Sequence, residues 1–179
     1  MKKMKAYSIS FSGLKIGEHH FEYDIDNTFF TDLDYSEFND ADLKVDLNFN
    51  KKTTLMELDF RTSGTVNVNC DLTNEPFDQK VDGSMNLIIK FGDKFNDDNE
   101  EILILPHGEF EINVAQFIYE MIILAIPLKK THPGIADGSL QSEILEVLEK
   151  LSPNKSAKNN KDNYQDPRWD SLKKLLTDK

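Results

Sequence analysis

The sequence of 179 residues has a single cysteine, Cys70, so it can form neither an intramolecular disulfide nor a zinc site made of several cysteines. It also lacks a long apolar run, because Glu120 and Pro127 interrupt the longest one, Phe117–Leu128. A membrane-spanning helix needs about 20 consecutive apolar residues. The N-terminal residues show neither the apolar core nor the cleavage site of a secretory signal. We therefore expect a cytoplasmic protein that has no membrane partner.

Basic residues are in the minority, since 21 Lys and Arg stand against 32 Asp and Glu and give a formal charge of -11 at pH 7. This balance disfavours a protein that coats RNA by charge alone. The charge is unevenly divided. Residues 150–179 contain eight basic and four acidic side chains, a net charge of +4, and the rest of the chain carries -15. The acidic body suits a basic partner, and the basic C-terminal segment suits phosphate.

Alternation of apolar and polar residues dominates residues 4–114 and is clearest over residues 43–49. It recurs over residues 19–25, 56–60, 66–70 and 85–91. Residues 92–100 are polar and are expected to form a loop. A period of two is typical of half-buried β-strands, and short connections favour antiparallel pairing. We predict an α+β protein whose body is a mainly antiparallel β-sheet or is barrel-like.

Helical spacing replaces this alternation in two later segments. Residues 114–126 are apolar on most sides, so we expect a deeply buried helix that ends at Pro127. A second helix is expected over residues 140–151, with Asp137 or Ser139 as its N-cap. The first 151 residues are therefore predicted to form a single β-rich domain that includes both helices.

The C-terminal segment differs in composition from this domain. Residues 152–165 have almost no apolar side chains and many Asn and Lys, which predicts a flexible linker. Residues 166–179 are predicted to form a short amphipathic helix, because an Asp-Pro pair at its start suits an N-cap followed by the first helical position. This helix could fold back onto the domain or dock on a partner, and the sequence leaves both open. The candidates for contact with a partner or RNA are Asp166, Pro167, Arg168, Trp169, Lys173 and Lys174.

No catalytic or metal-binding motif is present. The histidines His19, His20, His107 and His132 do not form a metal-ligand motif, and the chain has no glycine-rich phosphate loop and no nucleophile elbow. We expect His19 to be a hydrogen-bonded core residue, His107 to be solvated and Cys70 to be a buried, inert thiol. The sequence thus predicts a protein that is not an enzyme, with no metal, no cofactor and no small-molecule substrate.

Carboxylates at two places in the sequence are candidates for a binding role. The stretch Asp24–Asp42 is acidic but lacks the glycine and terminal glutamate of a calcium-binding EF-hand loop. We interpret it as a solvated loop or, more specifically, as a docking surface for a basic protein. Glu120 lies within the apolar helix, either on one exposed stripe or paired with a basic side chain inside. The sequence does not distinguish these two positions.

Three separated segments follow one family pattern. In residues 63–77, Cys70 stands at the first cysteine of a Cys-x-Arg-Cys-Leu motif, although Leu72 and Thr73 replace the arginine and the second cysteine. In residues 112–132, a helix with an internal glutamate leads into a Leu-x-x-Pro turn.

In that second segment the glutamate is Glu120 and the proline is Pro127. The third segment, residues 166–176, begins with Asp-Pro-Arg-Trp and ends with Lys-Lys-Leu-Leu. With these motifs the chain resembles, over about residues 1–179, the YceD family, the large ribosomal RNA subunit accumulation proteins of bacteria and plastids.

This resemblance implies a non-enzymatic role in ribosome biogenesis that supports the accumulation of large-subunit ribosomal RNA. It implies a large-subunit ribosomal protein or a pre-ribosomal particle as the partner, with ribosomal RNA as a further candidate. The alternative is an acidic, chaperone-like module for one basic protein, with no RNA contact. Many relatives have extra cysteines that look able to bind zinc. This chain has only Cys70, with His132 near a later cysteine position, and two ligands do not make a closed zinc site.

Overall fold

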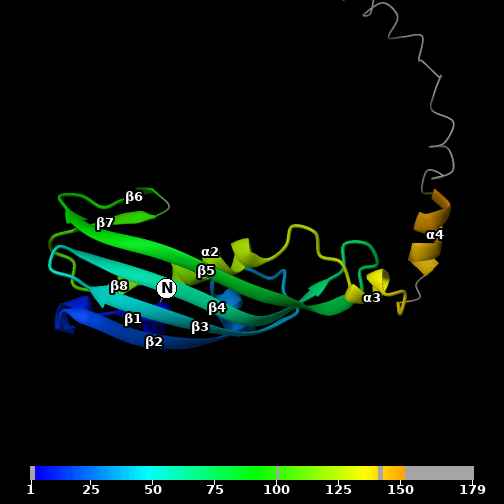
Figure 1. Cartoon of the computed structure of the whole chain (residues 1–179), viewed down its shortest axis with the longest axis horizontal. Helices are drawn as coiled ribbons and strands as arrows, with labels where there is room; N and C mark the ends of the chain where they lie inside the picture. Colours follow the sequence, from blue (N-terminus) through cyan, green and yellow to red (C-terminus); the bar gives the residue numbers. More distant parts are fainter. Residues whose placement is uncertain (1–2, 100, 141–142, 152–179) are drawn as a thin grey trace, which may run out of the picture. The chain divides into compact units, whose positions relative to one another are not determined.

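The chain divides into two units, Met1–Leu140 and Gln141–Lys179. The structure is a computed structural model and describes residues 3–99, 101–140 and 143–151 (Figure 1). The predicted linker over residues 152–165 and the predicted helix over residues 166–179 lie outside the described residues. No helix in the described part is both long enough and apolar enough to cross a membrane.

A six-stranded sheet forms the body of the first unit, with the strands in the spatial order β2-β3-β4-β5-β7-β6 (Figure 1). The strands are β2 (Gly17–Asp26), β3 (Asp40–Lys51), β4 (Leu55–Asn69), β5 (Pro76–Gly92), β6 (Asn96–Asn99) and β7 (Ile102–Pro106). All neighbours pair antiparallel except β5 and β7, which are parallel. The prediction of an α+β protein with a mainly antiparallel body is confirmed.

The sheet is open, because its outer strands β2 and β6 do not pair with each other, so the body does not close into a barrel. The prediction of a polar loop over residues 92–100 was wrong, since β6 lies within this segment. The side chains of β6 are all Asn or Asp, so no apolar alternation marks this strand. Strand β6 is the edge strand and pairs antiparallel with β7. Strand β7 lies between β6 and β5 and runs parallel to β5.

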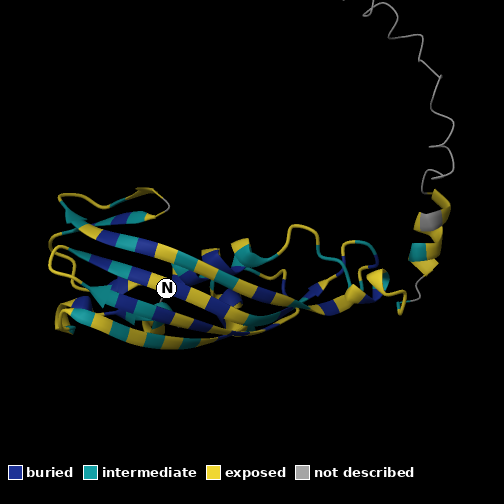
Figure 2. Ribbon diagram, in the orientation of Figure 1, coloured by how far each residue is buried: buried dark blue, intermediate teal, exposed yellow. Residues whose placement is uncertain are grey.

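The alternation of side chains separates a buried face from an exposed face. On β3, Leu43, Val45, Leu47 and Phe49 are buried, and most of the residues between them are exposed (Figure 2). Strands β4 and β5 repeat the pattern in register with β3. Each fully buried aliphatic or aromatic side chain contributes about 1.5–3 kcal/mol relative to an exposed one. The buried face is therefore the main source of stability.

Short elements and one longer helix cover this buried face. They are η1 (Lys3–Tyr7), β1 (Ser8–Ile9), η2 (Phe11–Gly13), α1 (Asn27–Asp32), β8 (Ile112–Asn113) and α2 (Ala115–Ala125). Helix α1 lies within the acidic stretch, where the sequence analysis expected a loop. Asp26 caps this helix by accepting a hydrogen bond from the Thr28 backbone N–H at 2.9 Å, and Phe29 and Phe30 are buried.

Helix α2 confirms the position predicted for a helix over residues 114–126, and Pro127 follows directly after its C-cap residue. The deep burial expected for this helix was wrong, because only four of its residues are buried. The helix packs closely on the sheet at Gly83, where an added Cβ would lie 2.8 Å from the Cβ of Ala125. Ile118 and Ile122 are buried against the core, but Leu124 is 82% exposed. The helix is therefore covered on one side only, because it lies on the sheet and not inside a core.

Two further helices follow, α3 (Pro133–Ala136) in the first unit and α4 (Glu143–Leu151) in the second. Helix α4 confirms most of the helix predicted over residues 140–151. Asp137, one of the two residues predicted to cap it, is instead the C-cap residue of α3. The Asp137 carboxylate accepts a hydrogen bond from the Ser139 backbone N–H at 2.9 Å. The pKa of Asp137 is lowered, first by a hydrogen bond from the Ser139 side chain and then by this backbone N–H.

Gly64 lies between the two alternating runs of residues 56–60 and 66–70, and β4 continues through it. Its φ is +150°, and an added Cβ would lie 2.3 Å from the backbone oxygen of Asp42 on β3. We predict that Gly64→Ala lowers the free energy of unfolding by at least about 2 kcal/mol, measured by urea denaturation.

The matched control is Gly108→Ala, because an added Cβ at Gly108 meets nothing within 4 Å. Its free energy of unfolding should change by about 0.5 kcal/mol or less. Equal losses in the two variants would contradict a specific clash between β3 and β4.

Candidate protein-binding surface

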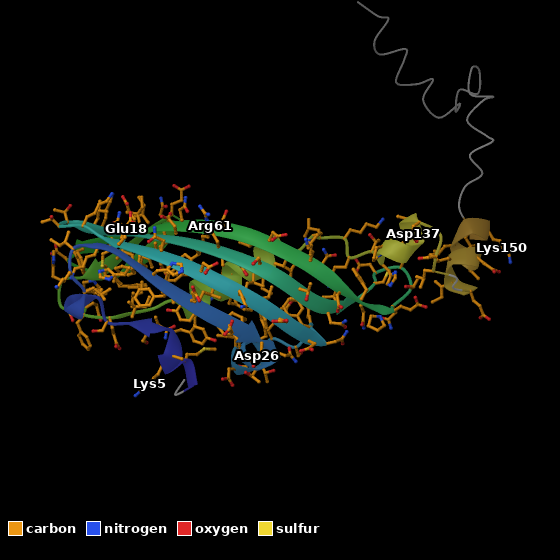
Figure 3. The ribbon with its side chains drawn as sticks, turned by 60° about the horizontal axis from the view of Figure 1, so that its bottom comes forward. Lys5, Glu18, Asp26, Arg61, Asp137 and Lys150 are labelled. Atoms are coloured by element: carbon orange, nitrogen blue, oxygen red, sulfur yellow. The ribbon has the colours of Figure 1, made fainter. Side chains whose placement is uncertain are left out.

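The face of the sheet opposite α2, here called the outer face, consists of the alternate residues of β2, β3, β4 and β5 that point away from the core. Its basic side chains are Lys44, Arg61, Lys80 and Lys90. Its carboxylates are Glu18, Glu22, Asp24, Asp26, Asp40, Asp42, Asp46, Glu57, Asp59, Asp78 and Asp82. The outer face is therefore strongly negative. Glu18 and Arg61 lie on this side of the sheet, and Lys5 lies on the other (Figure 3).

The strand register sets carboxylates against each other. Asp26 lies opposite Asp42, and Glu22 lies opposite Asp46. Like charges directly opposite each other on two strands are destabilising. Hydrogen bonds from the backbone N–H groups of Thr28 and Phe29 to the Asp26 carboxylate reduce the cost at the first pair. A cationic partner would stabilise the remaining carboxylates of the outer face.

His20 lies among these carboxylates. Its Nε2 is 3.3 Å from the Glu22 carboxylate and 3.7 Å from that of Asp46. These three exposed residues could also offer one metal ligand each, because their ligand atoms lie within 4.8 Å of one another. In the described part of the chain this is the single group of that kind. The absence of a metal stays a prediction.

Pairing of β2 with β3 brings the two ends of the acidic stretch Asp24–Asp42 onto one face of the sheet, and β4 and β5 add further carboxylates to that face. Asp24 on β2 and Asp42 on β3 come from opposite ends of the stretch and share the outer face. The predicted surface did not include the carboxylates that β4 and β5 add, such as Asp59 and Asp82. The alternation of polar and apolar residues already indicated a polar face on each strand. Only the pairing of the strands shows that the polar faces of β2, β3, β4 and β5 form one continuous surface.

The structure also brings Cys70 and His132 together. The His132 backbone N–H donates a hydrogen bond to the Cys70 sulfur at 3.3 Å. Asp71 and Lys130 tie the same two segments, since the Asp71 N–H donates to the Lys130 carbonyl at 2.8 Å. The imidazole Nδ1 of His132 accepts the Gly134 N–H at 2.9 Å and caps α3. This nitrogen is thus bonded within its own loop and is not free to bind a metal beside the sulfur.

Cys70 is 2% exposed, which confirms the expected buried thiol. Burial raises the pKa of this thiol. Hydrogen bonds from the Thr73 hydroxyl and from the backbone N–H groups of His132, Leu72 and Thr73 outweigh burial and lower the pKa to about 7. The thiol therefore ionises near neutral pH, but its burial keeps reagents away from the sulfur.

Three other expectations have clear outcomes. Glu120 is exposed and accepts a hydrogen bond from the Gln116 side chain at 2.8 Å, which places it on the exposed stripe of α2. His107 is exposed, as predicted. His19 makes the expected hydrogen bond, to the Lys15 carbonyl at 2.8 Å. The core position expected for His19 was wrong, because this residue lies near the end of edge strand β2 and is only half-buried.

The predicted contact residues of the C-terminal helix cannot be compared with this surface. Asp166, Pro167, Arg168, Trp169, Lys173 and Lys174 lie outside the described residues. Their role in binding a partner or RNA stays a prediction.

The fold and the outer face together define an α+β protein with an open, one-sided sheet and an acidic exposed face. The family model described as large ribosomal RNA subunit accumulation protein YceD matches residues 58–176, more than half of the chain. The chain belongs to the YceD family. The match includes Cys70, Glu120 and Pro127, and residues 1–57 lie outside it. Searches of curated proteins and of solved structures give no match.

We predict that the Cys70 thiolate absorbs at 240 nm with a titration midpoint near pH 7 in the folded protein. An unfolded cysteine has a pKa of about 8.5. Because folding lowers the pKa, this contribution to the free energy of unfolding is complete above about pH 8.5 and is lost as the pH falls through 7.

Thr73→Val removes the hydroxyl donor and should raise the midpoint of the 240 nm titration. The control, Thr54→Val, changes an exposed residue between β3 and β4 and should leave the midpoint unchanged. A midpoint near 8.5 in the unaltered folded protein would contradict the proposed hydrogen bonding.

Proposed function

We propose that this protein supports the accumulation of large-subunit ribosomal RNA as a non-enzymatic binding factor in the cytoplasm. Its outer face would bind a basic large-subunit ribosomal protein, free or within a pre-ribosomal particle. The family description supports the ribosomal role. The observation that carries the choice of partner is the acidic outer face, on which carboxylates outnumber lysine and arginine.

Physical complementarity favours a basic protein over RNA at this face. The face extends over four strands, and its fixed negative charge attracts lysine and arginine and repels phosphate. Ribosomal RNA would instead meet the basic C-terminal segment, through Arg168, Lys173 and Lys174. Two such contacts in one chain would raise the overall affinity through effective concentration.

The acidic outer face also favours a second candidate function. A module that only shields one basic protein before assembly would need this face and no RNA contact. The two functions differ in what the protein binds when RNA is removed. An assembly factor would co-sediment with precursor particles, and ribonuclease treatment would abolish this co-sedimentation. A module that only shields one basic protein would bind that isolated protein equally with and without ribonuclease and would not co-sediment with particles.

The outer face can be tested by neutralising charge without loss of core. We predict that the triple variant Asp46→Asn, Asp59→Asn, Asp82→Asn binds precursor large subunits at least about tenfold more weakly at about 0.1 M salt, measured by co-sedimentation. The difference from the unaltered protein should shrink as salt rises, because salt screens exposed charges.

A control with the same charge change is Asp93→Asn, Glu143→Gln, Glu146→Gln. These exposed carboxylates lie outside the outer face. The control should bind as the unaltered protein does. Equal weakening in both triple variants would mean that net charge, and not this face, determines binding.

The C-terminal segment can be tested by deleting residues 152–179. We predict weaker co-sedimentation with precursor large subunits, because the second contact and its avidity are lost. Binding to the isolated basic protein should be retained through the outer face. Unchanged co-sedimentation would remove the C-terminal segment from the proposed function.

A further inference from the structure

A groove of about 1170 Å³ lies beside α2, on the side of the sheet opposite the outer face. Leu87, Leu103 and Leu105, from β5 and β7, line it, and Phe117 and Leu124 line it from α2. Phe95, just before β6, also contributes. The groove therefore lies where α2 leaves the β7 and β6 end of the buried face uncovered.

The lining includes large apolar side chains that are exposed to solvent. Leu124 is 82% exposed and Phe95 is 56% exposed. Single exposed apolar residues are ordinary, but a concave surface that gathers several of them is typical of a binding site. Nothing in the core requires either side chain to be apolar, because neither is buried in it.

The charges around the groove all have one sign. Its acidic lining residues are Asp97, Glu101, Glu109, Glu111 and Glu120. Among the described residues that line it, none is Lys, Arg or His. This field repels phosphate and anionic membrane surfaces and attracts a cationic ligand. An occupant must therefore combine apolar side chains with positive charge.

The edge of the sheet disfavours an occupant that adds as a strand. Edge strand β6 has only polar side chains, including Asp97 and Asp98, and its pairing with β7 has a register shift. Charged side chains and irregular pairing are features that block strand addition. Contact must then come from side chains, as when an amphipathic helix lies in an apolar groove.

We propose that this groove binds an amphipathic, lysine- and arginine-rich helix of a protein partner. The apolar stripe of that helix packs on Phe95, Phe117 and Leu124, and its basic residues face Glu101, Glu109 and Glu120. This inference rests on the proposed function, since it gives the basic partner a second contact on the side of the sheet opposite the outer face.

The test uses a synthetic helix of leucine and lysine at helical spacing, bound to the full chain and followed by fluorescence anisotropy. The groove variant is Phe95→Ser, Leu124→Ser. Its control is Ile16→Ser, Leu128→Ser, since these residues are 68% and 103% exposed and do not line the groove.

We expect the groove variant to bind the synthetic helix at least about tenfold more weakly, with the control unchanged. A peptide of the same composition with scrambled leucines should bind the unaltered chain as weakly as the synthetic helix binds the groove variant. Equal binding by the groove variant and the control overturns the proposal, and so does equal binding of the scrambled peptide. The unaltered chain, the groove variant and the control are all monitored by circular dichroism to confirm equal folding.

Other occupants give different results, and each overturns the proposal. Tighter binding of the synthetic helix after deletion of residues 152–179 would assign the groove to the C-terminal segment of the chain. A dimer in sedimentation that the groove variant dissociates would assign it to a second copy. An RNA oligonucleotide that binds the unaltered chain but not the groove variant would assign it to RNA.

The same variants separate this inference from the proposed function. Asp46→Asn, Asp59→Asn, Asp82→Asn should weaken particle binding but leave affinity for the synthetic helix nearly unchanged. If only that triple variant loses particle binding and the groove variant still binds the synthetic helix fully, the groove proposal fails and the proposed function stands. If the groove variant alone loses both, the groove proposal stands and the outer face is not the main contact.

Discussion

The alternation of side chains along β3, β4 and β5 is the constraint on which the rest of the structure depends. A strand points successive side chains to opposite faces, so three long strands in register gather their apolar residues on one side. Helix α2 and the N-terminal elements cover that side, and the absence of a side chain at Gly83 lets α2 approach the sheet closely. Shifting any one of these strands by a single residue would exchange buried and exposed sets and remove both the core and the outer face.

One-sided burial explains how the sheet can carry an unfavourable charge pattern. The apolar face stabilises the fold, so the outer face can keep facing carboxylates such as Asp26 and Asp42 at a modest cost. The remaining excess of carboxylates on this face favours a basic partner through charge complementarity. The groove beside α2 follows from the same arrangement, because a single helix is too narrow to cover a six-stranded sheet.

The family positions within the described residues have structural explanations. Cys70 is buried and holds the His132 segment through its sulfur, and Pro127 follows the end of α2. Glu120 is different, because it is exposed and lines the groove. The contacts of Cys70 with His132 could not be predicted, since 61 residues separate them in the chain and no periodicity links them. Helix α1 was not predicted, because its aromatic residues lie in a stretch of acidic residues whose composition is typical of a solvated loop.

The sequence by itself determined the class of the fold, the buried faces of the main strands and the position of α2. Each of these follows from local periodicity, which depends only on neighbours along the chain. Only the tertiary structure decided that the sheet stays open, that β7 runs parallel to β5, and that carboxylates from four strands form one surface. These features depend on which strands lie side by side, and pairing between distant segments is set by packing of the whole core and not by any local pattern.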